Sequence, residues 1–549
     1  MHMDLRNLPG TSPLLRDYVH AFSRLAPFYA ANPQEDDSYR LQAARLDSQT
    51  YARDTVCAIL RKQAEGYGAP GEVLRHIETL GNPRAVAVIT GQQTGLFGGP
   101  LFTLYKALTA VRLAERLQVD LGRPVVPLFW LASEDHDLAE VDHAHFPDRG
   151  GEPVIIRHEA WGQPLGFMAA NLRLGPGIAD TLARARACLP ETEFLAALWS
   201  ALTAAYAPEA TLGEAFARWM AHLCGRLGLI LVDGADPRLK PLAARIFQQE
   251  MAEAPRSSRL ILEVSKALGA AGYPAQIEAR PDGVNCFLLR DGRHPLVRDG
   301  GSFRLRDCGE AVPVPELRRL AQEAPERFSP NVALRPIVQD TLFPTLAYVA
   351  GPGELAYFGQ LKELYEAFRV PMPLIVPRAG FTLLEPRVAQ LLERFRLGLP
   401  DFAQEPEQLA SRLFRSQLPP DFEAAIARAR TGVDEIFRGV GEIIATVDPT
   451  LRATVGQTAG HIKGHLEQLE KKAVQAIKRR EAETRQQLHR VRQALMPGGK
   501  PQERVFSVLP FLAKYGPSFV DVVRRNLDGP GWAHHLVTLS ADARPRPAE

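Results

Sequence analysis

Short apolar runs separated by helical segments dominate the first part of the chain. Residues 1–80 have helical character, and residues 85–90 and 124–132 (PVVPLFWLA) then form apolar runs typical of buried parallel strands. Between these runs, a glycine-rich turn leads into residues 101–117, which show helical spacing with Pro100 at the helix start. Since a crossover of this kind joins parallel neighbours, the unit predicts a parallel sheet.

Two later apolar runs, residues 227–233 and 373–377, are candidates for further strands of the same sheet. The segments at about 150–200 and about 255–330 are rich in Pro and Gly and interrupt the strand pattern. We interpret residues 1–385 as one doubly wound α/β core that carries these two segments as insertions.

The C-terminal third has the spacing of a coiled coil. Apolar positions alternate by four and three over residues 422–447 and again, with one slip of register, over residues 455–495. Asp448 and Pro449 interrupt the pattern, so we expect an antiparallel helical hairpin within residues 386–497, followed by a segment, 498–549, that packs back on the core. The many charges on the second arm are expected to be solvated rather than to bind nucleic acid. The predicted seam of the first arm consists of Phe422, Ile426, Ala429, Val433, Ile436, Val440, Ile443 and Val447.

Composition and charge restrict the range of partners. The chain has 549 residues and a formal net charge of +2, which gives no electrostatic reason to expect nucleic acid or an anionic membrane as the partner. The N-terminus lacks the apolar run of a signal peptide, and no stretch of about 18 uncharged apolar residues occurs. We therefore expect a cytoplasmic protein.

The cysteines are odd in number and scattered, which fits a reducing compartment better than a disulfide framework. No two of them have CxxC spacing, so the sequence does not support a structural zinc site. They are Cys57, Cys188, Cys224, Cys286 and Cys308.

The glycine-rich turn after the first strand is the first candidate site. Backbone N–H groups at a strand–turn–helix junction suit a phosphate or carboxylate, and two glutamine amides and a lysine could add donors. The alternative is a turn that only lets helix and strand pack closely, because the pattern is neither a dinucleotide fingerprint nor a Walker loop. The candidate residues are Thr90, Gly91, Gln92, Gln93, Gly98, Gly99 and Lys106.

An acidic loop after the second strand is the second candidate. It contains Glu134, Asp135, His136 and Asp137, and Glu140 and Asp142 follow closely. Because ligands of open parallel sheets bind outside the carboxyl ends of the strands, this loop and the glycine-rich turn are expected to lie side by side. The carboxylates could hold an ammonium group or Mg²⁺, and His136 could act as a general base. The alternative is a solvated acidic loop.

Two more segments offer groups for a substrate. In residues 328–340, Asn331, Arg335, Gln339 and Asp340 lie in an otherwise apolar run, where Arg335 could bind a carboxylate bidentately or pair internally with Asp340. A second strand–turn–helix start follows, and simple helix capping is its alternative explanation. Its candidate residues are Gly351, Glu354 and Tyr357.

Four ordered segments together resemble a known family. They are TGQQ-x-G-x-x-GGP, W-x-A-x-EDHD-x-x-E, FSPNV-x-LRP-x-x-QD and AGP-x-E-x-AYF, followed by the coiled coil and a Gln502-Glu503-Arg504 segment. In this order they resemble the cysteine-adding enzymes of bacillithiol biosynthesis. The resemblance implies a Rossmann-like core with two connecting insertions, a coiled coil that forms a homodimer, and a ligase that adds L-cysteine to glucosaminyl-malate.

The implied chemistry sets requirements of its own. Amide formation from a free carboxylate needs activation, so we expect ATP or another nucleotide as co-substrate, and Mg²⁺ could accompany it. The activated intermediate would be an acyl-adenylate or an acyl-phosphate. The glycine-rich turn would then surround a phosphate or carboxylate, the acidic loop would handle the amine and its proton, and Arg335 would hold the malyl carboxylate. Two alternatives stay open: another amide-forming ligase or nucleotidyltransferase on the same core, and a non-catalytic coiled-coil scaffold.

Overall fold

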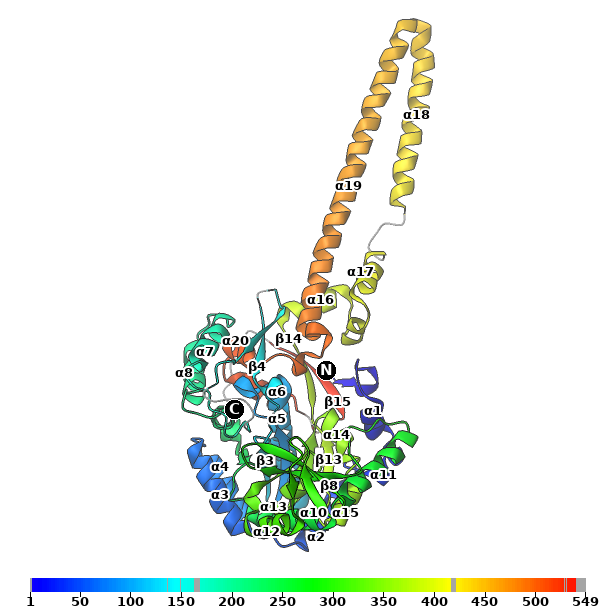
Figure 1. Ribbon diagram of the computed structural model, residues 1–549. Helices are drawn as coiled ribbons and strands as arrows, with labels where there is room; N and C mark the ends of the chain where they lie inside the picture. Colours follow the sequence, from blue (N-terminus) through cyan, green and yellow to red (C-terminus); the bar gives the residue numbers. More distant parts are fainter. Residues whose placement is uncertain are drawn as a thin grey trace. The chain divides into compact units, whose positions relative to one another are not determined.

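The computed structural model describes all residues except 1, 136, 149, 162–167, 416–420, 528, 530 and 540–549. The chain divides into two compact units. The larger comprises Met1–Pro386 with Pro497–Glu549, and the smaller comprises Arg387–Met496. Figure 1 shows the course of the chain through both.

A five-stranded parallel sheet forms the centre of the larger unit. Its order is β13-β12-β2-β3-β6, with parallel pairing throughout. The chain moves from β2 outward to β6 and later fills the other side with β12 and β13, so the strand order reverses between β2 and β12. The predicted Rossmann-like parallel sheet is confirmed. The strands are β2 (Val86–Gln92), β3 (Val125–Leu131), β6 (Ile230–Asp233), β12 (Thr345–Ala350) and β13 (Leu374–Pro377).

Helices cover both faces of this sheet. Its strands are apolar at successive positions and therefore present apolar side chains on both faces, which have to be buried. Val86 and Val88 of β2 enter one buried cluster, whereas Ala87 and Ile89 enter another. The first cluster includes residues of α2 and α5, and the second includes residues of α1, α3, α4 and α13. These helices are α1 (Pro13–His20), α2 (Asp36–Asp47), α3 (Arg53–Gly66), α4 (Gly71–Leu80), α5 (Leu101–Leu121) and α13 (Arg335–Leu342).

The segment expected as the second insertion contains a five-stranded antiparallel sheet of order β10-β9-β8-β7-β11. Its last strand, β11, leads directly into α13, so this sheet approaches the same edge of the parallel sheet. Its strands are β7 (Gly283–Leu289), β8 (Arg293–Asp299), β9 (Ser302–Leu305), β10 (Ala311–Val312) and β11 (Phe328–Pro330). The neighbouring helices are α10 (Ala244–Glu253), α11 (Arg256–Ala270), α12 (Val314–Glu323), α14 (Pro352–Phe358) and α15 (Lys362–Ala367).

The segment expected as the first insertion is smaller. It follows the short helix α6 (Leu138–Val141) and forms the antiparallel pair β4 (His143–Pro147) and β5 (Pro153–Arg157). The helices after it, α7 (Ile178–Ala187), α8 (Leu195–Ala205) and α9 (Leu212–Cys224), contribute to a second large buried cluster together with α5.

The C-terminal segment completes a small sheet with the N-terminus. β15 (Ala533–Thr538) lies between β1 (His2–Asp4) and β14 (Gly380–Leu384). Before it come α20 (Leu509–Tyr515) and α21 (Ser518–Arg525). The buried carboxylate of Glu503 accepts hydrogen bonds from Arg378 and from the backbone of Phe381, which ties the segment to the end of β13.

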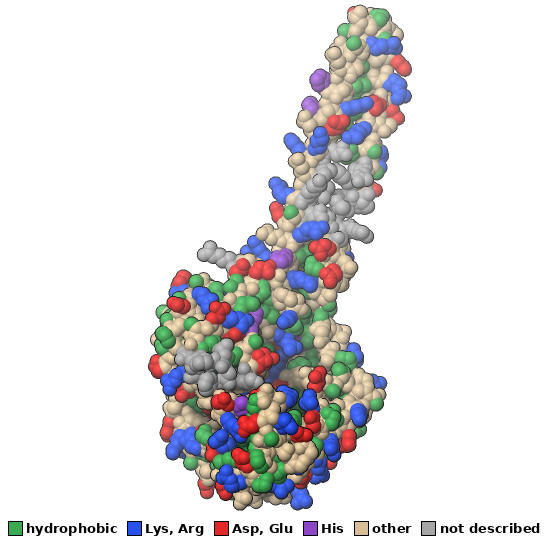
Figure 2. Space-filling view, in the orientation of Figure 1, with side chains coloured by type: hydrophobic (Ala, Val, Ile, Leu, Met, Phe, Trp, Pro, Cys, Tyr) green, Lys and Arg blue, Asp and Glu red, His purple; other side chains and the backbone are tan. Residues whose placement is uncertain are grey.

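The smaller unit is a helical hairpin with two short helices. α18 (Phe422–Val447) and α19 (Arg452–Leu495) run antiparallel and are joined by a turn that Asp448 caps through the backbone N–H of Thr450. Acidic and basic side chains alternate along its visible surface (Figure 2), as expected for solvated faces. The short helices are α16 (Pro386–Phe395) and α17 (Pro406–Arg415).

The predicted hairpin is confirmed, but the predicted seam is wrong for its outer half. Ile436, Ile443 and Val447 are 64%, 70% and 80% exposed, so they do not face α19. Gly441 is buried instead and lies against Val455 of α19. The helix therefore has two apolar stripes, and the spacing alone does not tell which one closes the hairpin.

Candidate functional site

A cavity of about 520 Å³ opens where the strand order of the parallel sheet reverses. Residues at or just beyond the carboxyl ends of four strands line it: Gln92 at the end of β2, Glu134 after β3, Gly351 after β12 and Arg378 after β13. Open α/β sheets bind their ligands at such a switch point. Its other lining residues include Gly91, Gln93, Phe102, Lys106, Trp130, Asp135, Phe287, Arg293, Asn331, Val332, Arg335, Tyr348, Gly353, Glu354, Tyr357 and Arg504.

The glycine-rich turn and the acidic loop are in direct contact. The amide nitrogen of Gln93 donates to Asp135 over 2.7 Å and to Glu140 over 2.6 Å. The backbone N–H of Ala132 donates to the carbonyl of Gln92 over 3.0 Å. The two loops thus meet above one parallel sheet and enclose a shared cavity, as the order of the elements predicted.

The acidic loop separates its members into different environments. Glu134 is 7% exposed and accepts a hydrogen bond of 2.5 Å from the equally buried Lys240. Asp135 is half-buried at the cavity wall, 3.8 Å from Arg293. Asp137 is exposed and does not line the cavity, and His136 lies outside the described residues. Of the predicted acid–base residues that are described, Glu134 and Asp135 are therefore at the cavity.

Lys106 connects the turn to the second strand–turn–helix junction. Its ammonium donates to the carbonyl of Gly91 over 2.5 Å and to the side-chain oxygen of Gln92 over 3.0 Å, and it pairs with Glu354. Burial lowers the pKa of Lys106, and the Glu354 carboxylate opposes this shift. Because these contacts use all three ammonium donors, Lys106 holds the loop in place rather than reaching freely into the cavity.

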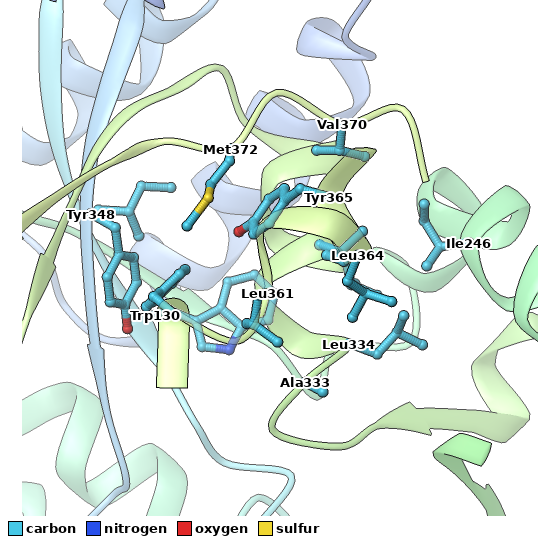
Figure 3. Packing of buried hydrophobic residues seen from close by; sticks show 14 of the residues in the cluster. Trp130, Ile246, Ala333, Leu334, Tyr348, Leu361, Leu364, Tyr365, Val370 and Met372 are labelled. Atoms are coloured by element: carbon cyan, nitrogen blue, oxygen red, sulfur yellow. The ribbon is translucent and has the colours of Figure 1, made fainter. Parts of the chain in front are cut away.

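Glu354 caps the helix that follows β12. It accepts from the backbone N–H of Gly351 over 2.7 Å and from the hydroxyl of Tyr348 over 2.8 Å. The capping explanation for this junction is thus correct, and the junction also borders the cavity through Gly351, Glu354 and Tyr357. Tyr348 and Trp130 belong to the large buried cluster below (Figure 3), which gives the cavity a packed floor.

Arg335 is presented to the cavity by buried polar groups. Its guanidinium donates to the side-chain oxygen of Gln339 and to the hydroxyl of Tyr357, each over 3.0 Å. It does not pair directly with Asp340, which is 2% exposed and accepts from Thr345, Tyr365 and Gln339. Gln339 and Asp340 are behind Arg335 and do not line the cavity. Burial raises the pKa of Asp340 to about 6.

Asn331 lines the cavity at the start of α13. Its side-chain oxygen accepts from the backbone N–H groups of Ala333 and Leu334 over 3.0 and 3.1 Å, and its amide donates to Asn285. Asn331 thus fixes the helix that carries Arg335.

Three residues predicted at a phosphate are not at the cavity. Thr90 is fully buried and ties β2 to β12 through a 2.8 Å hydrogen bond to the carbonyl of Val349. Gly98 has φ +89°, and a Cβ there would lie 2.9 Å from Trp219. Gly99, with φ +70°, continues the same turn. For this half of the turn the packing explanation is the correct one, since a side chain at Gly98 would collide with Trp219 of α9 and a Cβ at Gly99 would lie 3.1 Å from Thr103 of α5.

The structure adds basic residues that the sequence did not single out. Arg293 of β8 lies over the ring of Phe287 at 4.0 Å, and its side chain is 7% exposed. Arg378 pairs with Glu503 over 2.5 Å, and Arg504 follows Glu503 in the C-terminal segment. Arg378 directly follows a predicted strand, so the rule that located the acidic loop would have found it. Arg293 carried no such signal, and Arg504 was named only as part of the Gln502-Glu503-Arg504 segment of the family resemblance.

The charge balance of the lining favours an anionic ligand. Five basic side chains, including Arg293, Arg335 and Arg378, and three acidic ones line the cavity. Guanidinium groups bind carboxylates and phosphates bidentately. Asp142, His143 and His145 have the spacing of a small metal-binding group, but the Asp142 carboxylate pairs with Arg157 and lies 2.9 Å from Nδ1 of His143, so an internal ion pair explains this group.

The fold and this site define a Rossmann-like α/β protein with a polar cavity at its switch point and an appended antiparallel coiled coil. Comparisons with known proteins identify the family. Residues 1–379 match the N-terminal Rossmann-like domain of bacillithiol biosynthesis BshC, and residues 381–539 match its C-terminal coiled-coil domain. The chain belongs to the BshC family, which confirms the resemblance drawn from the four motifs.

The relatives are similar over nearly their full length. A protein of Salinibacter ruber is 36% identical over 526 residues, covering 95% of this chain and 96% of the relative. Proteins of Chlorobaculum tepidum and Symbiobacterium thermophilum are each 34% identical, covering 96% and 98% of this chain and 97% and 100% of the relatives. All three carry the name "Putative cysteine ligase BshC". No helix among the described residues meets the length and apolarity that a membrane span requires.

Proposed function

We propose that this chain is a ligase that joins L-cysteine to the amine of glucosaminyl-malate, after a nucleotide such as ATP activates the cysteine carboxylate. Membership of the BshC family supports the reaction class. The observation that supports the assignment of this reaction to the cavity is the contact between the glycine-rich turn and the acidic loop, in which Gln93 donates to Asp135. A ligase of this kind would work in the cytoplasm, where ATP and cysteine are available.

Arg335 is the group we assign to the malyl carboxylate. Its contacts to Gln339 and Tyr357 use two of its five N–H donors and fix the plane of the guanidinium. A fixed plane favours bidentate binding, because little side-chain entropy is lost when the ligand arrives. Arg293 and Arg378, on other parts of the wall, would then face the phosphates of the nucleotide, together with Mg²⁺ if the nucleotide brings it.

Asp135 is the group we assign to the amine and its proton. The amine must lose a proton to attack the activated carboxyl carbon, and a carboxylate at the cavity wall can hold the ammonium and accept that proton. Glu134 is less suited to this role, because Lys240 already occupies its carboxylate. The attack forms the amide bond and expels the phosphate-containing leaving group. The neighbouring His136 stays a candidate for the same proton.

Substitution of Arg335 tests the proposal. We expect Arg335→Met to lower kcat/KM for glucosaminyl-malate about 100-fold, since a lost charged hydrogen bond in a desolvated site costs on the order of 3 kcal/mol. Formation of the cysteinyl amide with ATP would be followed by mass spectrometry.

Arg298→Met is the matched control, because Arg298 is on β8, stacks on Phe303 at 4.6 Å and does not line the cavity. Equal activity of Arg335→Met and Arg298→Met in folded protein would remove the assignment. If the wild-type protein cleaves ATP only with a different amine, the chain is another amide-forming ligase on this core. If the wild-type protein binds no nucleotide at all, the result favours the hypothesis of a non-catalytic coiled-coil scaffold.

The exposed apolar stripe of α18 supports a homodimer. Ile436, Ile443 and Val447 present large apolar side chains to solvent along one face, which single chains rarely leave uncovered. We expect Ile436→Asp combined with Ile443→Asp to convert a dimer to a monomer in analytical ultracentrifugation. The control Glu435→Asp combined with Glu442→Asp changes the same helix without adding charge to the stripe and should stay dimeric. A wild-type monomer at all concentrations would exclude this interface.

A further inference from the structure

A second group of metal-ligating side chains lies on the antiparallel sheet, away from the cavity. His294 is on β8, while Asp307 and Cys308 are in the turn between β9 and β10. None of the three lines the cavity. The turn is tightly closed by backbone hydrogen bonds of 2.8 Å between Leu305 and both Gly309 and Glu310, so it holds Asp307 and Cys308 beside β8.

The three side chains offer one nitrogen, one oxygen and one sulfur ligand atom, all within 4.8 Å of one another. Among the residues that the structure describes, this is the group with a geometry that could hold a metal ion. Sulfur and imidazole together favour a borderline ion such as Zn²⁺ over Mg²⁺ or Ca²⁺, which prefer oxygen.

Two of the three ligands, His294 and Asp307, are also held by neighbouring groups. The Nε2 of His294 is 2.7 Å from a carboxylate oxygen of Asp291, which leaves Nδ1 directed at Asp307. The Oδ1 of Asp307 accepts from the backbone N–H of Cys308 over 3.1 Å, which leaves Oδ2 directed at His294. Outer carboxylates that fix the histidine tautomer are typical of metal sites.

Binding requires only a small rearrangement. His294 Nδ1 and Asp307 Oδ2 are 2.8 Å apart, whereas ligands of a tetrahedral Zn²⁺ lie roughly 3.3 Å apart at bond lengths of about 2.0–2.1 Å. The proton between them would leave with the thiol proton when the ion enters. The side chain of Cys308 is exposed and can turn toward the ion.

We propose that His294, Asp307 and Cys308 form a Zn²⁺-binding site, with water as the fourth ligand and Asp291 as the outer partner of the histidine. The ion would fasten the β9–β10 turn to β8, the strand that carries Arg293 into the cavity. The proposal does not depend on the ligase assignment, because its ligands and its test are separate from the cavity.

Cobalt and zinc titrations of the full-length protein test the site. We expect one equivalent of Co²⁺ to produce a thiolate-to-metal charge-transfer band that Zn²⁺ displaces. Cys308→Ser should remove this band, and His294→Gln should weaken Zn²⁺ at least tenfold in competition with a chromophoric chelator. Zn²⁺ should also protect Cys308 from alkylation by a maleimide.

Two controls separate this site from other thiols and from the cavity. Cys188→Ser removes another partly exposed thiol and should leave the band unchanged. Asp135→Asn alters the cavity and should also leave it unchanged. The proposal is overturned if Co²⁺ gives no thiolate band, if the band persists in Cys308→Ser, or if Zn²⁺ leaves the alkylation rate of Cys308 unaltered. In those cases His294 is simply an imidazole paired with Asp291 and Asp307.

Discussion

Replacement of Asp340 by Asn tests the electrostatics of the buried carboxylate next to Gln339, the residue that holds Arg335. Asp340 is 2% exposed, and its carboxylate accepts hydrogen bonds from Gln339, Thr345 and Tyr365 over 2.9, 2.6 and 2.5 Å. Burial nevertheless raises its pKa from 3.8 to about 6, because the hydrogen bonds only partly replace the lost hydration of the charge. The variant keeps the shape of the side chain and removes its charge.

The sign of the effect follows from the raised pKa. The folded state holds the Asp340 proton more tightly than the unfolded chain, so its contribution to stability is fully present below pH 3.8 and is lost as the pH rises through about 6. The loss above both values is about 3 kcal/mol. Between pH 5 and pH 8 it amounts to about 1.4 kcal/mol, because part of it has already occurred at pH 5.

The assay is equilibrium urea unfolding of wild type and Asp340→Asn at pH 5 and pH 8. We expect the stability of wild type relative to the variant to fall by about 1.4 kcal/mol between these pH values. All other titrating groups cancel in the difference. The exposed Asp54→Asn is the control and should follow wild type at both pH values. A difference between wild type and Asp340→Asn that does not change with pH would refute the reasoning, since it would show that burial does not raise the pKa of Asp340.

Three further predictions concern the frame of the site, and each is measured by urea unfolding at pH 7.5. Lys240→Met should lower the free energy of unfolding by about 3 kcal/mol, because it leaves the buried Glu134 without its 2.5 Å partner, and adding Glu134→Gln should recover part of the loss. An unchanged midpoint in the single variant would contradict the pairing. Gly98→Ala should lower the free energy of unfolding by about 2 kcal/mol or more, since the φ of Gly98 is +89° and the new Cβ would lie 2.9 Å from Trp219. A neutral effect would mean that the turn relaxes freely. Thr211→Ala removes the capping box of α9 and should cost about 1 kcal/mol, whereas Thr211→Ser should restore most of it.

The parallel sheet could be predicted because its signal is local. Strands such as β2 and β3 are buried on both faces, so their sequences are continuous apolar runs that no surface helix would show. The crossover between them then determines direction and neighbourhood, and the carboxyl-end rule brings Gln92 and Glu134 to one edge. The order of the short motifs sufficed to identify the family.

The hairpin shows where local pattern becomes insufficient. Heptad spacing predicted two antiparallel arms, and the structure has them at α18 and α19. It did not reveal that Gly441 faces the second arm while Ile436 and Ile443 face outward. Spacing reports that a residue is apolar and periodic, but not whether the surface that covers it belongs to the same chain.

What the sequence by itself determined is therefore the parallel sheet with its crossover helix, the two arms of the hairpin and the two loops that meet at one edge of the sheet. Only the tertiary structure decided which of those residues are held in ion pairs and which further residues reach the cavity. Lys106 is occupied by Glu354, Glu134 is occupied by Lys240, and Arg293 reaches the cavity from a distant antiparallel strand. The physical reason is that charge pairing and burial depend on contacts between residues more than a hundred positions apart, which leave no periodic trace along the chain.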